Sequence, residues 1–431
     1  MFSIYLNDFE YFVSRKYNGL SFISNEINRL LSDEDIEFFI RMYTLLYADD
    51  TVIMAESPEQ LQLALNTVFE YCNLWDLTVN LDKTKIIIFS NGKVRKHPIF
   101  KFGNGIVDVV YEYIYLGSHF KAIKKQINQA RKAMFSLLTK ARRLSLPVDI
   151  QCDLFDKVIV PILLYGSEVW GYSNISQIEI FYRKFLRNIL FLGKSTPNCM
   201  VYGEVGRLPL KTLIEKRMIS FWIRITEGKK SKLSHILFNI QRKLEQRGES
   251  QSAWVNSIKD VLHRCSFTNL WNDQELYKTK KLLKSSIFKT IDELETTCWR
   301  TQLFQNSACH TYRIVKQNFG FENFLTKLDF KSRIIMTKFR CSVNKLPANK
   351  NRFSNEDADR LCTLCDLEDR GDEYHYLFNC CFFENQRKIY LKRYYRNRPN
   401  TLKMKELFDS TNNKEQSNLI KFIKEILSNF H

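Results

Sequence analysis

The sequence predicts an α+β protein with a small β-containing N-terminal part, a long helical middle and a small zinc-binding C-terminal domain. Short runs rich in β-branched, aromatic and apolar residues, which favour strands, lie within roughly the first 120 residues. The chain has only 14 glycines and 8 prolines, and its long charged and Leu/Ile/Phe-rich segments are typical of helices. Cysteines are scattered except near the C-terminus, where they gather beside a histidine.

Composition restricts the class of protein and of partner. With 431 residues, 45% of them hydrophobic, the chain is long enough for two or three globular domains. A formal net charge of +18 indicates a polyanionic partner, and nucleic acid is the expected one. The N-terminal segment carries acids inside a short apolar run, which fits neither a secretory signal nor a membrane span. Since the 11 cysteines indicate reduced thiols, we expect an intracellular protein, nuclear or cytoplasmic, that is not secreted and has no membrane partner.

The stretch Leu45 to Ala55, LLYADDTVIMA, places two aspartates between two short apolar runs. Thr44 to Tyr47 and Thr51 to Ala55 are strand-like, so the ADD between them is predicted to be a hairpin tip. Adjacent carboxylates repel each other, and a hard divalent cation such as Mg²⁺ removes that cost by binding them. Asp49 and Asp50 are therefore candidate Mg²⁺ ligands, although an isolated pair of this kind also fits a solvated turn.

A helix is predicted directly after the hairpin. Ser57-Pro58-Glu59-Gln60 combines an N-cap residue, a proline at the first helical position and a glutamine that closes a capping box. Beyond the helix, Leu77 to Lys85 reads as an extended piece with an Asn/Asp turn, and a strand follows at Ile86 to Phe89. A second strand pair is predicted between residues 107 and 120. The apolar residues expected to form the buried face of the helix are Leu61, Leu65, Val68, Cys72 and Trp75.

A long amphipathic helix is predicted next. Apolar residues recur in steps of four and three and form a continuous seam, while basic residues occupy the other faces. This basic face fits plain solvation, and it also fits contacts to nucleic-acid phosphates that do not read sequence. The seam consists of Ile123, Ile127, Ala130, Met134, Leu137, Ala141 and Leu144. The basic residues are Lys124, Lys125, Arg131, Lys132, Lys140, Arg142 and Arg143.

The C-terminal part contains a possible metal site with the spacing C-x2-C-x9-H-x4-C. Two cysteines separated by two residues form a knuckle, and thiolate and imidazole ligands suit a closed, tetrahedral structural Zn²⁺ site. Cys381 competes with its neighbour for the fourth position, and four unlinked residues are the alternative. The predicted ligands are Cys362, Cys365, His375 and Cys380. Arg340, Lys345, Arg352, Arg360, Arg370 and Arg387 surround them and make RNA attachment plausible.

Several blocks, taken in order, resemble the reverse transcriptases encoded by LINE-type, non-LTR retrotransposons. YADD at Tyr47 to Asp50, the following AESPEQLQ, the block YCNLWDLTVNLDKTKIIIF and the later YIYLG are similar to the palm of that family. PILLYGSEVWGY at Pro161 to Tyr172 and the run at Lys184 to Leu210 look like its thumb and connecting region. The cysteine and histidine cluster is similar to its C-terminal zinc-knuckle-like element. The resemblance covers nearly the whole chain.

The resemblance implies roles for particular residues. Asp49 would be the principal metal ligand, with Asp50 beside it, and Lys83 would act near the phosphates of the incoming nucleotide, although plain solvation of this lysine is an equal alternative. Tyr115, Leu116 and Gly117 would correspond to the primer grip, or else to an ordinary buried turn. Of the basic helix residues, Lys124, Lys125, Arg131 and Lys132 are the candidate nucleic-acid contacts.

The resemblance also implies a domain order and a function. A partial palm is expected over residues 1–120, a helical thumb over 121–230, a helical connector over 231–339 and the zinc-binding domain over 340–431. The family's fingers and first catalytic aspartate would lie upstream of a segment like Met1 to Asp8, so we expect the chain to begin in mid-domain. Two explanations of such a start are open. The retrotransposon could be truncated at its 5′ end, or Met1 could be an internal methionine of a longer reading frame.

The expected function is that of the C-terminal portion of an RNA-directed DNA polymerase that uses an RNA template, a DNA primer and Mg²⁺. Because two-metal catalysis needs carboxylates from two separate strands, we expect this portion to be inactive alone. The alternative is a non-catalytic RNA-binding or scaffold protein derived from the thumb and the zinc knuckle. An upstream strand that bears an aspartate would distinguish the two.

Overall fold

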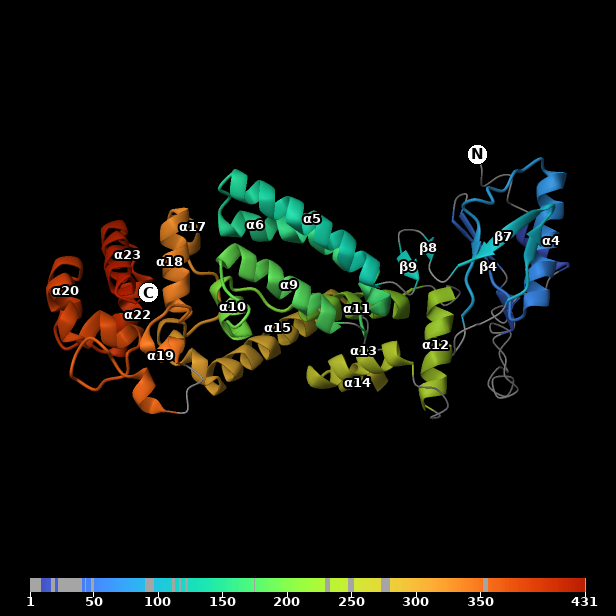
Figure 1. Cartoon of the computed structure of the whole chain (residues 1–431). Coiled ribbons are helices and arrows are strands. Elements are labelled where there is room, and N and C mark those ends of the chain that lie inside the picture. Colours follow the sequence, from blue (N-terminus) through green and yellow to red (C-terminus); the bar gives the residue numbers. More distant parts are fainter. Residues whose placement is uncertain are drawn as a thin grey trace. The chain divides into compact units, whose positions relative to one another are not determined.

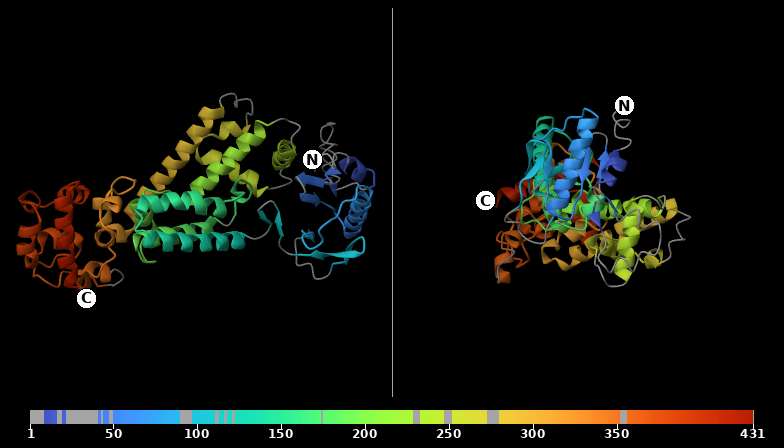
Figure 2. Two further views of the ribbon diagram at one scale, coloured as in Figure 1. Left: turned by 90° about the horizontal axis from the view of Figure 1, so that it is seen from above. Right: turned by 90° about the vertical axis from the view of Figure 1, so that its right-hand side faces the viewer.

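The computed structural model is mainly helical, with short strands in its N-terminal part, which confirms the predicted α+β class (Figures 1 and 2). The chain divides into two compact units. We call Met1–Ile123 with Arg224–Val255 the N-terminal unit, and Lys124–Ile223 with Asn256–His431 the C-terminal unit. The three boundaries between the four predicted domains stay predictions. The structure describes residues 9–16, 20–21, 41–42, 44–47, 50–89, 97–110, 113–115, 118–120, 123–173, 175–228, 233–246, 252–272, 280–351 and 356–430.

The predicted hairpin is present in the N-terminal unit. Strands β3 (Thr44–Tyr47) and β4 (Asp50–Ile53) pair antiparallel, with Tyr47 opposite Asp50, so that two residues connect them. The second strand begins at Asp50, one residue earlier than predicted, because this aspartate already pairs across the hairpin. The short elements around this hairpin are helix α2 (Phe9–Ser14) and the paired strands β1 (Leu20–Ser21) and β2 (Arg41–Met42).

Helix α4 (Pro58–Leu74) begins where the capping residues predict. The Ser57 hydroxyl accepts the Gln60 backbone N–H at 3.2 Å, and the Gln60 side-chain oxygen accepts the Glu56 N–H at 3.2 Å, one residue before the position expected for a capping box. The prediction that Trp75 is buried is wrong. Its side chain is 45% exposed, because it lies beyond the last helical residue. Tyr71 is buried in its place.

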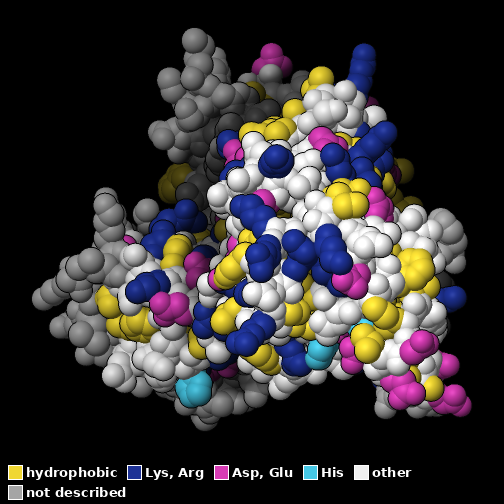
Figure 3. All heavy atoms as spheres, turned by 90° about the vertical axis from the view of Figure 1, so that its left-hand side faces the viewer, with side chains coloured by type: hydrophobic (Ala, Val, Ile, Leu, Met, Phe, Trp, Pro, Cys, Tyr) yellow, Lys and Arg dark blue, Asp and Glu magenta, His cyan; other side chains and the backbone are white. Residues whose placement is uncertain are grey.

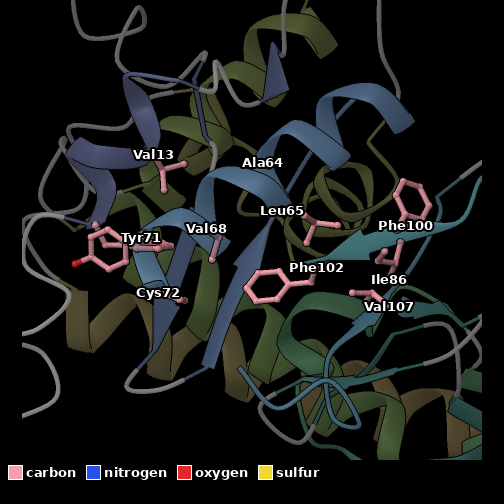
Figure 4. Packing of buried hydrophobic residues seen from close by; sticks show 11 residues of the cluster. Val13, Ala64, Leu65, Val68, Tyr71, Cys72, Ile86, Phe100, Phe102 and Val107 are labelled. Carbon is pink, nitrogen blue, oxygen red and sulfur yellow. The ribbon is translucent and has the colours of Figure 1, made fainter. Parts of the chain in front are cut away.

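The core of the N-terminal unit lies between α4 and a three-stranded sheet (Figure 4). In this sheet the central strand β7 (Gly105–Val109) pairs parallel with β5 (Lys85–Ile86) and antiparallel with β6 (Phe100–Phe102). The strand predicted for Ile86 to Phe89 is therefore shorter and starts earlier. Leu65 and Val68 of the helix pack in one cluster with Phe102 of the sheet.

A second hairpin follows, as predicted. Strands β8 (Tyr113–Tyr115) and β9 (Ser118–Phe120) pair antiparallel, with Tyr115 opposite Ser118. Helix α12 (Leu233–Gln246) also belongs to the N-terminal unit, whereas α11 (Leu210–Thr226) and α13 (Ala253–Arg264) cross the division between the units.

Helix α5 (Ile123–Arg143) is the predicted amphipathic helix, with two corrections to its seam. Leu138, which the prediction omits, is buried, and Leu137 is only half-buried, since successive buried positions follow the helical period of about 3.6 residues. Leu144 is 67% exposed because it lies beyond the helix end. The side chain of Ile123 lies outside the described residues.

The other described elements of the C-terminal unit are helices and helical turns, and Figure 1 labels most of them. The first group is α6 (Val148–Leu154), the π-helical turn η2 (Phe155–Ile159), α7 (Val160–Leu163), α8 (Ser167–Trp170), α9 (Ile175–Leu190), α10 (Asn198–Glu204), α14 (Thr268–Asn272), α15 (Lys280–Gln305), η4 (Ser307–Cys309) and α16 (Tyr312–Val315). The second is α17 (Phe324–Lys327), α18 (Phe330–Arg340), α19 (Pro347–Lys350), η5 (Asp357–Arg360), η6 (His375–Asn379), η7 (Cys381–Phe383), α20 (Glu384–Tyr390), α21 (Arg393–Arg396), α22 (Thr401–Asp409) and α23 (Asn413–Ser428).

A buried ion network connects these two groups. The guanidinium of Arg340, at the end of α18, lies 3.1 Å from a carboxylate oxygen of Glu204 in α10 and 3.0 Å from one of Glu322. Lys316 binds the second oxygen of Glu322. Burial acts to lower the pKa of Arg340, but the two carboxylates more than compensate, so its pKa is raised and the side chain stays charged. The network therefore keeps two carboxylates and two cations balanced inside the unit.

We predict that Arg340→Met lowers the free energy of unfolding of the C-terminal unit by about 3–5 kcal/mol, because it leaves Glu204 buried without its cationic partner. Urea unfolding of the full chain, followed by tryptophan fluorescence, measures this loss. Lys331→Met, at an exposed position of the same helix, is the control and should change stability by less than about 0.5 kcal/mol. An Arg340→Met protein as stable as this control would show that the network does not stabilise the unit.

Candidate functional site

The predicted Mg²⁺ ligands lie at the tip of the β3–β4 hairpin. Asp50 is the first residue of β4, and the register leaves only Ala48 and Asp49 between the strands. Ala48 and Asp49 lie outside the described residues, as does the side chain of Asp50. The described strands therefore bracket the predicted ligands, and the metal-binding role of the two aspartates stays a prediction.

The turn that carries Lys83 is built by Asn80. The side-chain oxygen of Asn80 accepts the Lys83 backbone N–H at 3.1 Å, and its carbonyl accepts the Thr84 N–H at 3.0 Å. Lys83 is exposed in this turn, immediately before strand β5. The predicted Asn/Asp turn is confirmed, and Lys83 is an exposed residue of the N-terminal unit.

The predicted primer-grip residues fall on the β8–β9 hairpin. Tyr115 ends β8 and pairs with Ser118. Leu116 and Gly117 are the two connecting residues and lie outside the described residues, as does the side chain of Tyr115. Strands β8 and β9 pair on either side of these two residues, and the primer-grip role stays a prediction.

The candidate nucleic-acid contacts on α5 are all exposed. Lys124, Lys125, Arg131 and Lys132 lie on the faces that the buried seam leaves to solvent, and Arg131 donates a hydrogen bond to Asn128 at 2.9 Å. The helix presents a row of cations without burying their charged groups.

The C-terminal cluster is assembled as predicted. The Sγ atom of Cys362 lies 3.6 Å from that of Cys365 and 3.9 Å from that of Cys380, and Cys365 Sγ lies 3.4 Å from His375 Nε2. All four ligand atoms lie within 4.8 Å of one another. Sulfur atoms at these separations are too far apart for a disulfide, whose S–S bond is about 2.05 Å.

Backbone hydrogen bonds hold the two cysteines of the knuckle. The Cys362 N–H donates to the carbonyl of Asp369 at 2.8 Å, and the Leu364 N–H points at the Cys362 sulfur at 3.4 Å. Leu361 and Arg370 pair as an isolated bridge at the base of this loop. The loop thus closes on itself and turns both thiols to the same side.

The other two ligands come from the following helical turns. His375 begins η6, and Cys380 follows at its end, where it is buried, while the neighbouring Cys381 is exposed. The geometry therefore favours Cys380 over Cys381 as the fourth member. Sequence analysis missed Asp369, whose carboxylate lies 3.2 Å from His375 Nδ1, on the side of the ring opposite the cluster. Five acidic residues lie between Cys365 and His375, so the sequence indicates that a carboxylate could contact the histidine but not that it is Asp369.

For two of the basic residues around the cluster, the expectation that they attach RNA is wrong. Arg340 belongs to the buried ion network, and Arg387 is buried and donates to the carbonyls of Leu377 and Cys380, both at 2.8 Å. Both guanidinium groups are used inside the protein, because nearby helix ends offer them buried oxygen acceptors. Lys345 is exposed, and Arg352 lies outside the described residues.

Comparison with known proteins adds independent information. Residues 2–120 match the family model of reverse transcriptase, an RNA-dependent DNA polymerase. A transposon-derived protein of Caenorhabditis elegans is 28% identical over 140 residues, which are 30% of this chain and 49% of that protein. RNA-directed DNA polymerases from the mobile element jockey of Drosophila funebris and Drosophila melanogaster are each 24% identical, over 160 and 162 residues, or 33% of this chain and 17% of theirs. No solved structure matches the chain.

Residues 2–120, which include the β3–β4 hairpin, match the reverse transcriptase family model, so the N-terminal part is similar to a reverse transcriptase domain. The chain is a homologue of the reverse transcriptases of non-LTR retrotransposons, as its motifs predict. It spans at most about half the length of the curated relatives that it matches. Among the described helices, none is both long and apolar enough to cross a membrane.

Proposed function

We propose that this chain takes part in RNA-templated DNA synthesis, with Asp49 and Asp50 as the Mg²⁺ ligands that it contributes. The observation that carries this proposal is the two-residue connection of the β3–β4 hairpin, inside the region matched by the reverse transcriptase family. Mg²⁺ bound at such a site would stabilise the negative charge that develops on the phosphates during nucleotide addition.

The chain's own residues then have separate tasks. The two aspartates would bind and orient the metal, and the exposed Lys83 would stabilise phosphate charge from its turn. The hairpin of Tyr115, Leu116 and Gly117 would hold the primer backbone. In the proposed reaction, the template is an RNA strand and the primer is a DNA strand.

In the natural protein that carries this chain, Asp49→Asn should reduce primer extension on an RNA template by at least about 100-fold, since the metal loses its principal carboxylate. Asp76→Asn is the matched control: Asp76 is exposed and has a positive φ of 52°, a conformation that asparagine also tolerates. Extension that is equal in the two variants would contradict the assignment of Asp49.

We propose that the basic face of α5 binds the phosphates of the template and primer. Replacing Lys124, Lys125, Arg131 and Lys132 together by glutamine should lower the slope of log affinity against log salt concentration by up to about 3, at roughly 0.7–0.9 per phosphate contact. Fluorescence anisotropy with an RNA–DNA hybrid measures the slope. The control replaces four other exposed cations, Arg300, Lys327, Lys331 and Lys414, by glutamine. Equal slopes in both variants would assign the α5 residues to a solvated face.

We also propose that Cys362, Cys365, His375 and Cys380 bind one structural Zn²⁺. Zinc–sulfur bonds of about 2.3 Å in tetrahedral geometry would place two sulfur atoms about 3.8 Å apart. The distances of 3.6 Å between Cys362 and Cys365 and of 3.9 Å between Cys362 and Cys380 agree with this value. The contact between Asp369 and His375 would fix the imidazole so that Nε2 faces the metal. All four ligands belong to the protein, so the ion would have no catalytic role.

The zinc assignment predicts about one zinc per purified chain, measured by atomic emission. Cys380→Ser should lose the metal, whereas Cys381→Ser should retain it, because Cys381 is exposed and outside the cluster. The knuckle loop buries little apolar surface, with Leu367 53% exposed, so removal of the ion by a chelator should unfold it. A folded wild-type chain without metal would defeat the assignment.

A second candidate function is RNA binding without catalysis. It is favoured by the location of the cysteine and histidine cluster and of α5, which lie in the C-terminal unit and outside the matched residues. Figure 3 shows the face on which α20 and α23 lie, where Lys and Arg side chains gather across the middle and acidic ones at a lower corner. Retained RNA affinity in Asp49→Asn is expected under both functions, so the primer-extension assay is the measurement that separates them.

A further inference from the structure

A polar cavity lies beside the cysteine and histidine cluster, within the C-terminal unit. Its volume is about 240 Å³, below the range of about 300–1,000 Å³ that is typical of pockets for drug-sized ligands. His310 and Arg313, from the segment after η4, line one part, and Arg360, Arg370 and Asp372 line another. The cavity is therefore of a size for one small group, and most of its ionisable residues are cationic.

The charge of this cavity is unbalanced. Three arginines line it, and Asp372 is the one acidic residue among the lining residues. Asp372 is already occupied: one oxygen accepts the His375 backbone N–H at 3.0 Å, and the other lies 3.9 Å from His310 Nδ1. Within the described part of the chain, neither Arg313 nor Arg370 forms a side-chain ion pair or hydrogen bond. Two arginines thus line the cavity, and neither has an acidic partner within the described part of the chain.

Electrostatics at His310 agrees with this arrangement. Burial lowers the pKa of His310, Asp372 opposes that effect, and both Arg370 and Arg313 add to it. The two guanidinium groups therefore act on the same imidazole, although they come from segments far apart in the sequence. Such a convergence of cations is favourable when an anion binds between them.

We propose that this cavity binds a backbone phosphate of a single-stranded nucleic acid, with Arg313 and Arg370 as its two guanidinium contacts. The planar fork of arginine matches the oxygens of a phosphate group, and a cavity of this volume suits one phosphate with its sugar. The choice of a nucleic-acid strand as the source of the phosphate rests on the proposed function. The site is separate from α5 and from the metal ligands.

The fold connects this phosphate site to the knuckle. Arg370 ends the knuckle loop and pairs with Leu361, while the Gly371 N–H donates to the Arg360 carbonyl at 2.8 Å. The Ala348 N–H donates to the carbonyl of Gly371 at 3.2 Å and fixes this loop against the segment after α18. A folded knuckle therefore presents Arg370 to the cavity, which gives the small metal-binding loop a direct part in holding the strand.

The test uses the full chain and a fluorescently labelled 20-nucleotide single-stranded RNA of mixed sequence. The double variant Arg313→Gln/Arg370→Gln should bind it about tenfold more weakly, and the slope of log affinity against log salt should fall by about 0.7, as expected for one phosphate contact to a single strand. The control Arg300→Gln/Lys327→Gln removes the same charge at exposed positions outside the cavity and should keep the wild-type affinity and slope. Circular dichroism checks that all three proteins are folded.

Equal affinity and slope in the double variant and the control would overturn this inference while leaving the proposed RNA binding intact. If the wild-type chain binds no RNA, the proposed function and this inference both fail, which is a distinguishable result. A parallel arm measures thermal stabilisation by inorganic phosphate. If the double variant lost only that stabilisation and kept its RNA affinity, the cavity would be a site for free phosphate, and the assignment to a nucleic-acid strand would be wrong.

Discussion

The ion network around Arg340 is the interaction on which the C-terminal unit depends. Its guanidinium is fully buried, binds two carboxylates and lies over the rings of Phe324 and Phe408, at 5.1 and 5.8 Å from their centroids. Burying a charge is costly unless it is paired and hydrogen-bonded, so α10, α18 and α22 have to meet in one arrangement. The segment after Arg340 leads directly to Ser342 and Asn349, which line the polar cavity.

A second set of polar contacts, around Glu373, connects the segment after α18 to the cysteine and histidine cluster. Glu373 lies two residues before His375, and its carboxylate accepts hydrogen bonds from the side chains of Asn344 at 2.9 Å and Asn349 at 2.6 Å. These contacts join the segment after α18 to the turn that carries His375. The segment after α18 therefore begins at Arg340 of the ion network and is joined by these hydrogen bonds to the turn that carries His375.

Much of the local structure was predictable from the sequence. The β3–β4 hairpin, the start of α4 at Ser57 and the Asn80 turn follow from cap, turn and strand residues that act within a few positions of each other. Errors arose at element ends, where Trp75 and Leu144 lie just beyond their helices and are exposed. The spacing of apolar residues predicts which face of a helix is buried, but it does not predict the residue at which the helix ends.

The sequence by itself indicated Cys362, Cys365 and His375 as members of the cluster through their spacing and chemistry, whereas the choice of Cys380 over Cys381 came from the tertiary structure, which buries only the former. The sequence also determined the relationship to reverse transcriptases, through motifs in a fixed order. Only the tertiary structure decided which arginines face outward. Arg340 and Arg387 look no different in sequence from Arg370, yet they are buried and paired, while Arg313 approaches Arg370 across 57 positions of the chain. Whether a cation is used inside or offered to a ligand depends on which acceptors the fold brings within its reach, and those acceptors come from distant segments.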